Sequence, residues 1–176
     1  TRVFGATAAL TKLVRDALQE VGAERIVDLG SGSGGPMREV VNTLRADAQQ
    51  PLEVSLLMTD LYPNPQALER FNDGSEAHIR YHESPVNALE LATAPSGLKT
   101  MVNSFHHLRP EEARQVLASA RTHRQPLLVY ELADNVMPFG VWCLLLPLGL
   151  LMVGLSCLIL TPFSRPLTLR QLLLTY

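Results

Sequence analysis

The sequence is poor in cysteine, in aromatic residues and in net charge. Only Cys143 and Cys157 occur among its 176 residues, which excludes a disulfide framework, and no companion ligands suggest a metal site. Aromatic residues make up 6% of the chain, and the formal net charge is -2. Because single-stranded nucleic acid is usually bound by aromatic side chains within a basic groove, we expect no nucleic-acid partner.

No basic segment followed by an apolar run occurs near Thr1, so we expect no secretory signal in this sequence. Disulfide-rich domains belong to oxidising compartments, and two cysteines do not suggest one. We therefore expect a cytoplasmic location, with membrane association as an open alternative that depends on the apolar segment described below.

Charged residues are missing from one long stretch of the chain. All 17 acidic residues and 13 of the 15 basic residues lie within 1–134, whereas no charged residue lies between positions 135 and 164. This composition predicts a domain over 1–134 and an apolar helical segment over 135–176. A hydrophobic fraction of 47% is enough for a buried core and excludes a disordered chain.

Helix and strand patterns alternate along the first part. Apolar residues at helical spacing predict helices over 6–21, 37–46, 65–72 and 110–122. Short apolar runs predict strands over 25–29, 54–59, 79–82, 99–105 and 127–131. Such alternation is typical of a parallel sheet covered by helices on both faces, so we predict an α/β sandwich of three layers with a mainly parallel sheet of about five strands. Ligands of these sheets bind at the carboxyl ends of the strands.

The strongest motif follows the first predicted strand, where Asp28 precedes a run of alternating glycines. Glycine lets the backbone turn sharply and approach a ligand closely, and the helix that follows presents free N–H groups. Read as Gly30-x-Gly32-x-x-Gly35, the turn matches a dinucleotide fingerprint that binds pyrophosphate. Read as Asp28-x-Gly30-x-Gly32-x-Gly34, it is a different motif.

The acid at the strand end favours the second interpretation, because a carboxylate there repels a pyrophosphate. A dinucleotide site would also place its ribose-binding acid about 20 residues further on. The next acid at a strand end is Asp60, which lies 30 residues after Gly30. The glycine motif together with Asp60 resembles the class I, Rossmann-like, S-adenosylmethionine-dependent methyltransferases.

The resemblance covers roughly residues 5–134 and implies a binding site for S-adenosylmethionine. In this family the glycine turn binds the methionine part, an acid at the second strand end binds the ribose, and the loop after the third strand binds the adenine. An Asn or Asp is common at the fourth strand end. The residues of this sequence that match are Asp28, Gly30, Gly32, Gly34, Asp60, Leu61, Asn87, Ala88 and Asn103. Leu61 and Ala88 would contact the adenine face. The amide oxygen of Asn87 would accept a hydrogen bond from the adenine amino group, at a position where the family often has an acid.

His106 and His107 are the candidate catalytic residues, since they belong to the Asn-Ser-Phe-His-His-Leu run that resembles the family's fourth strand end. An imidazole can take a proton from an acceptor hydroxyl or amine, but the same run also occurs as a structural turn. We expect methyl transfer to a small-molecule acceptor by direct displacement, without a metal. We interpret Glu131, at the end of the last predicted strand, as a solvated residue rather than one facing the cleft.

Two other functions stay open. One is an NAD(P)-dependent oxidoreductase that uses the same glycine turn. The other is a non-catalytic, membrane-anchored or dimerising module. Because the family's sheet has more strands than the five predicted here, we also expect the chain to be a truncated piece of a longer protein.

The apolar segment 136–163 favours the anchored or dimeric forms. Of its 28 residues, 8 are Pro, Gly, Ser or Thr and the other 20 are strongly apolar. A run of about 18 apolar residues is long enough to span a membrane, and Trp142, Arg165 and Arg170 suit the membrane interface. Pro147 could divide the run into two short helices. We expect this segment to contact a membrane, a second copy of the chain or a missing segment.

Overall fold

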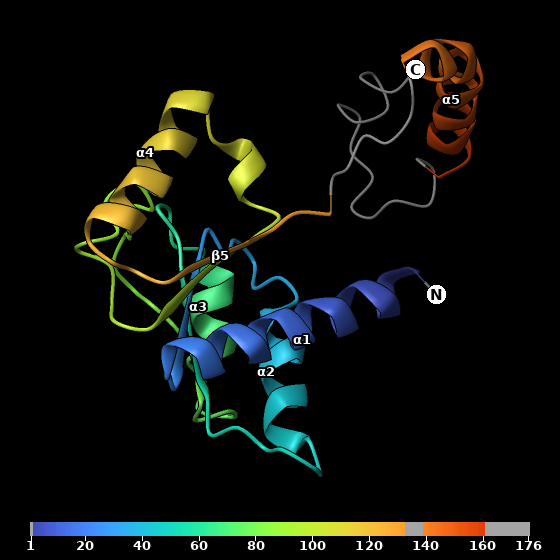
Figure 1. Ribbon diagram of the computed structural model, residues 1–176. Coiled ribbons are helices and arrows are strands. Elements are labelled where there is room, and N and C mark those ends of the chain that lie inside the picture. Colours follow the sequence, from blue (N-terminus) through green and yellow to red (C-terminus); the bar gives the residue numbers. More distant parts are fainter. Residues whose placement is uncertain (1, 133–138, 161–176) are drawn as a thin grey trace. The chain divides into compact units, whose positions relative to one another are not determined.

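The computed structural model describes residues 2–132 and 139–160 (Figure 1). The chain divides into two compact units, Thr1–Ala133 and Asp134–Tyr176, which are described separately.

The first unit is an α/β domain with the predicted alternation of helices and strands. Its sheet has the strand order β3-β2-β1-β4-β5, and every neighbouring pair is parallel. The elements in chain order are α1 (Arg2–Val21), β1 (Arg25–Leu29), α2 (Met37–Ala46), β2 (Ser55–Thr59), α3 (Pro65–Phe71), β3 (Ile79–Tyr81), β4 (Leu98–Val102), a 3-10 turn (Phe105–His107), α4 (Pro110–Thr122) and β5 (Leu127–Tyr130). The predicted Rossmann-like fold class is confirmed.

Helices cover both faces of the sheet, and the alternation of side chains along β1 shows how. Ile26 packs into one cluster with Leu10 of α1 and Val40 of α2. Val27, the next residue, packs into a second cluster with Val116 of α4. Successive residues of a strand point to opposite faces, so β1 is buried on both sides and forms the middle layer.

The register of the sheet brings the carboxyl ends of three strands together. Asp28 of β1 lies opposite Met58 of β2 and opposite Thr100 of β4. The residues that follow β1, β2 and β4 therefore meet at one edge of the sheet, where ligands of such folds bind.

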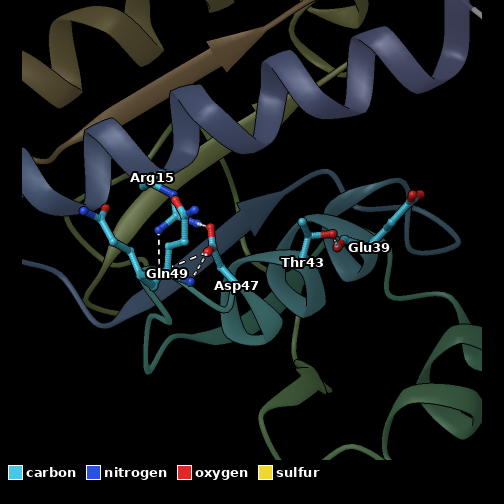
Figure 2. A network of polar contacts seen from close by, with 6 residues as sticks. Arg15, Glu39, Thr43, Asp47 and Gln49 are labelled. Carbon is cyan, nitrogen blue, oxygen red and sulfur yellow. Dashed lines mark hydrogen bonds and ion pairs between the residues drawn. The ribbon is translucent and has the colours of Figure 1, made fainter.

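Polar contacts fix α1 against the end of α2 (Figure 2). Arg15 of α1 donates to the Asp47 carboxylate at 2.6 Å and to the carbonyl oxygen of Gln50 at 2.7 Å. The other carboxylate oxygen of Asp47 accepts the backbone N–H of Gln49 at 2.9 Å. Asp47 thus ends α2 and ties the loop after it to α1, away from the carboxyl edge of the sheet.

Element boundaries mostly agree with the sequence analysis, and two of the differences bear on the site. Asn64 caps α3 as its position before Pro65 predicts, accepting the N–H groups of Gln66 and Ala67. The predicted strand 99–105 ends at Val102, because Asn103 has a left-handed backbone with φ +53°. The strand predicted over 127–131 ends one residue early, which places Glu131 in the loop after β5.

The second unit contains α5 (Phe139–Leu160). Pro147 lies inside this helix, so the predicted alternative of two short helices separated by the proline is wrong. Over the residues that the structure describes, no helix is both long and apolar enough to cross a membrane. The rest of the predicted segment 135–176 lies outside the described residues.

Candidate functional site

The glycine loop between β1 and α2 packs tightly against two neighbouring segments. Gly30 has φ +71°, and a Cβ atom there would lie 3.1 Å from the Cβ of Ser104, just after β4. Gly34 has φ +118°, and a Cβ atom there would lie 2.6 Å from the ring of Phe71 in α3. These positions require glycine both for backbone conformation and for space, so the loop has a defined shape.

Asp28 lies beneath this loop and is 4% exposed. Its two carboxylate oxygens accept hydrogen bonds from the hydroxyls of Ser31 and Thr100, each at 2.6 Å. Burial raises the pKa of Asp28 from its ordinary value of 3.8 to about 6; the two hydroxyls lower it less than burial raises it, and the nearby charge of Asp60 raises it further. Asp28 therefore stabilises the glycine turn through its hydrogen bond to Ser31 and ties it to β4 through its hydrogen bond to Thr100.

This raised pKa makes the stability of the domain depend on pH. The unfolded chain releases the Asp28 proton near pH 4, whereas the folded chain keeps it until about pH 6. The folded state therefore binds more protons within this window, so stability falls as the pH rises through it. We expect Asp28 to contribute a loss of about 3 kcal/mol between pH 4 and pH 7.

Urea unfolding of the Asp28→Asn variant measures this contribution. Asparagine keeps both positions polar, and the two hydroxyls can donate or accept, so the variant should gain stability over the native chain as the pH rises from 4 to 7. Asp47→Asn is the control, because backbone N–H groups of Gln49 and Gln50 hold the pKa of that half-buried carboxyl below its ordinary value. Its contribution is lost only toward lower pH. A pH-independent difference between Asp28→Asn and the native chain would contradict the raised pKa.

Asp60, just after β2, joins the second strand end to the glycine loop. Its Oδ2 atom accepts the N–H of Gly32 at 2.9 Å, and its Oδ1 atom accepts the N–H of Tyr62 at 2.9 Å. The N–H of Ser31 also donates to the carbonyl oxygen of Thr59 at 3.0 Å. The carboxylate is thereby fixed in orientation, and each oxygen retains a lone pair for a hydroxyl group of a ligand.

The loop after β3 reaches the same place through its backbone, since the N–H of Val86 donates to the carbonyl oxygen of Asp60 at 2.9 Å. Leu61 is 44% exposed and is available to a ligand, whereas Ala88 is half-buried and packs on the cluster under α4. The side-chain oxygen of Asn87 accepts the N–H of Leu89 at 3.0 Å. The side-chain oxygen of Asn87, which was predicted to accept a hydrogen bond from adenine, therefore already has one backbone partner and keeps one lone pair.

Asn103 connects the ends of β4 and β5. Its N–H donates to the carbonyl oxygen of Tyr130 at 2.9 Å, and its side-chain oxygen accepts the N–H of Leu132 at 2.9 Å. Next to it, the Ser104 hydroxyl donates to the carbonyl oxygen of Leu29 at 3.1 Å. The segment after β4 is thus anchored to β1 on one side and to β5 on the other.

Glu131 is not a solvated strand end, and that interpretation was wrong. Its Oε2 atom lies 2.5 Å from Nδ1 of His106, and its Oε1 atom accepts the N–H of Phe105 at 2.8 Å. Burial opposes the charged form, but the hydrogen bonds from His106 and Phe105 hold the pKa of Glu131 below its ordinary value. The pairing of β4 with β5 puts the residues that follow both strands at one edge of the sheet, and this pairing is seen only in the structure.

The two candidate histidines are thus in different surroundings. The rings of His106 and His107 are 4.2 Å apart between centroids, and His106 carries the contact to Glu131. Among the described residues, no group of three or more His, Cys, Asp or Glu side chains is placed to hold a metal ion.

A hollow of about 760 Å³ lies at the opposite edge of the sheet. It is lined by residues at the amino ends of β1 and β2, among them Arg25 and Ser55. None of the predicted site residues lines it. Since the two edges are separated by the length of the strands, this hollow is distinct from the edge that carries the glycine loop.

Comparisons with known proteins extend to fold only. No family model and no curated protein matches the sequence. Among solved structures, the chain is similar to the methyltransferase domain of bacterial CtHen1-CN, with 16% identity, a TM-score of 0.45, and coverage of 68% of this chain and 63% of that one. It is also similar to a protein from Galdieria sulphuraria described as a putative sarcosine dimethylglycine methyltransferase, with 18% identity, a TM-score of 0.46, and coverage of 69% and 46%.

A third similar structure is the [4+2]-cyclase SpnF, with 20% identity, a TM-score of 0.43, and coverage of 74% of this chain and 47% of that one. The chain therefore spans less than two thirds of the length of each of these proteins. With TM-scores below 0.5 and identities of 20% or less, these similarities carry no argument about function. A fold hosts many reactions, so function has to be argued from the site of this chain.

Proposed function

We propose that the first unit binds S-adenosylmethionine at the carboxyl edge of its sheet and that the protein transfers the methyl group to a small-molecule acceptor. The observation that carries this proposal is the Asp60 carboxylate, which accepts the N–H of Gly32 and so lies against the glycine loop. An acid in this position suits the two hydroxyls of a ribose.

The remaining residues have roles that follow from their places. The backbone of Gly30, Gly32 and Gly34 would leave room for the methionine part of the cofactor. The Asp28 carboxylate beneath the loop would attract the ammonium group of that methionine part. Leu61 and Ala88 would contact the adenine, and the second lone pair of the Asn87 side-chain oxygen would accept a hydrogen bond from the adenine amino group. Asn103 would hold the segment after β4 beside the methyl group.

The reaction would be a direct displacement at the methyl carbon. The sulfonium is a good leaving group, so positioning of the acceptor can supply most of the acceleration. No step of this scheme uses a metal ion or an electron transfer.

Calorimetric titrations of the full chain with S-adenosylhomocysteine and, in parallel, with NADH test the cofactor class. We expect micromolar binding of S-adenosylhomocysteine and no heat of binding with NADH. Binding of NADH alone would replace the proposal with an oxidoreductase. Binding of neither ligand would contradict a preformed cofactor site in this chain.

A further inference from the structure

Tyr81, the last residue of β3, carries a hydroxyl that reaches the glycine loop from within the domain. The side chain is 2% exposed and belongs to the cluster that includes Ala67 and Phe71 of α3. Its hydroxyl donates to the carbonyl oxygen of Gly32 at 2.9 Å. A buried tyrosine usually finds a hydrogen-bond partner for its hydroxyl. Here that partner is a main-chain atom of the loop between β1 and α2.

The surroundings of Tyr81 fix its main chain and keep its hydroxyl protonated. Asn72, just after α3, accepts the N–H of Tyr81 at 2.9 Å and donates to its carbonyl oxygen at 3.0 Å. Burial raises the pKa of the Tyr81 hydroxyl above its ordinary value, a backbone hydrogen bond from Asn64 lowers it less, and the charges of Asp60 and Asp28 raise it further. The hydroxyl therefore keeps its proton at neutral pH and remains a donor.

Gly32 is consequently held on both sides of its Cα atom. Its N–H donates to Oδ2 of Asp60 at 2.9 Å, and its carbonyl oxygen accepts the Tyr81 hydroxyl. Its φ is +54°, and a Cβ atom there would meet nothing within 4 Å, so this side of the loop is open. A ligand can approach the main chain closely at such a glycine. Two side chains, one following β2 and one ending β3, thus set the position of an approachable part of the loop.

We propose that Tyr81 is a positioning residue of the cofactor site, whose hydroxyl fixes the Gly32 main chain against which the methionine part of S-adenosylmethionine lies. This inference rests on the proposed function. Tyr81 acts through Gly32, because its own side chain is buried and has almost no surface to offer a ligand. Phenylalanine would fill the same space in the core but would leave the Gly32 carbonyl without this donor.

The first part of the test is calorimetric titration of the native chain, Tyr81→Phe and Thr11→Val with S-adenosylhomocysteine. Tyr81→Phe should raise the dissociation constant about three- to tenfold, because one buried hydrogen bond is lost. Thr11→Val is the control, because it removes another buried hydroxyl that donates to a main-chain carbonyl, that of Thr7 at 2.8 Å within α1. Its affinity should stay within about twofold of the native value.

The outcomes of these titrations separate this inference from the proposed function. An unchanged affinity in Tyr81→Phe, or an equal loss in Thr11→Val, would overturn the role of Tyr81 and leave the proposed function in place. Failure of the native chain to bind S-adenosylhomocysteine would overturn the proposed function, and the inference with it.

The second part examines whether the loss is confined to one part of the ligand. Methylthioadenosine contains the adenosine and the thioether sulfur but lacks the amino acid part that is placed against Gly32. Its dissociation constant, measured by NMR titration, should differ by less than about twofold between the native chain and Tyr81→Phe. A general loosening of the domain would weaken both ligands by the same factor, and that result would contradict a positioning role.

The third part observes the hydrogen bond itself and needs no ligand. The ¹³C resonance of the Gly32 carbonyl reports whether a donor is bound to it, because a hydrogen bond deshields the carbonyl carbon. In Tyr81→Phe this resonance should move to lower chemical shift, whereas the carbonyl of Leu29, which accepts the Ser104 hydroxyl, should keep its native shift. An identical Gly32 carbonyl shift in the two proteins would overturn the inference, whatever the affinities.

Discussion

Asp60→Ala is expected to weaken the binding of S-adenosylhomocysteine by about one to three kcal/mol, which corresponds to roughly 5- to 150-fold in the dissociation constant. The variant loses the hydrogen bonds to the ribose. It also releases the N–H of Gly32, so the glycine loop loses one of its hydrogen bonds to the end of the second strand and keeps the one from Ser31 to Thr59. Calorimetric titration of the native chain and the variant measures the difference directly.

Asp60→Asn should not rescue the affinity. Both carboxylate oxygens accept backbone N–H groups, from Gly32 and Tyr62, so an amide would leave one donor facing another. Glu53→Ala is the matched control, because it removes the same charge just before the other end of β2, where the side chain of Glu53 is 89% exposed. Unchanged affinity in Asp60→Ala would contradict the assignment of this residue to the ribose.

Gly34→Ala is expected to destabilise the domain by about 3 kcal/mol. The φ of +118° is strained for any residue with a Cβ atom, and the added methyl group would lie 2.6 Å from the Phe71 ring. Backbone strain of this kind costs roughly 1–2 kcal/mol, and overpacking costs roughly 1–3 kcal/mol. The free energy of unfolding in urea, measured at constant pH, gives the sum.

Gly35→Ala separates the two causes. Gly35 has φ +48°, and a Cβ atom there would meet nothing within 4 Å, so only the backbone strain is expected. Phe71→Leu added to Gly34→Ala should recover part of the loss, because it shortens the side chain that the methyl group meets. If Gly34→Ala costs no more than Gly35→Ala, the close packing of the loop against α3 is contradicted.

The fold could be predicted from the sequence because its signals are local and repeated. Short apolar runs alternate with helical patterns from residue 6 to residue 131, and a sheet buried on both faces needs that pattern. Boundaries were less predictable. The fourth strand was predicted to reach Phe105, but the left-handed backbone at Asn103 ends it at Val102, and nothing in the hydrophobic pattern reports a backbone angle.

The candidate site was predictable where it depends on backbone chemistry. The glycine spacing and the acids at two strand ends indicated the loop and Asp60, and the structure brings these together. Side-chain pairing was harder to foresee. Glu131 and His106 are 25 positions apart, and the pairing of β4 with β5 brings the segments that carry them together.

The carboxyl edge of the sheet is assembled largely by its own main chain. The loop after β1 is joined to Thr59 and Asp60, the carbonyl of Asp60 holds the loop after β3, and Asn103 joins β4 to β5. A ligand that binds here does not have to order these loops, so little of its interaction free energy is spent on conformational entropy. The edge is therefore preorganised, and recognition can proceed as the docking of a ligand onto a rigid frame rather than as folding around it.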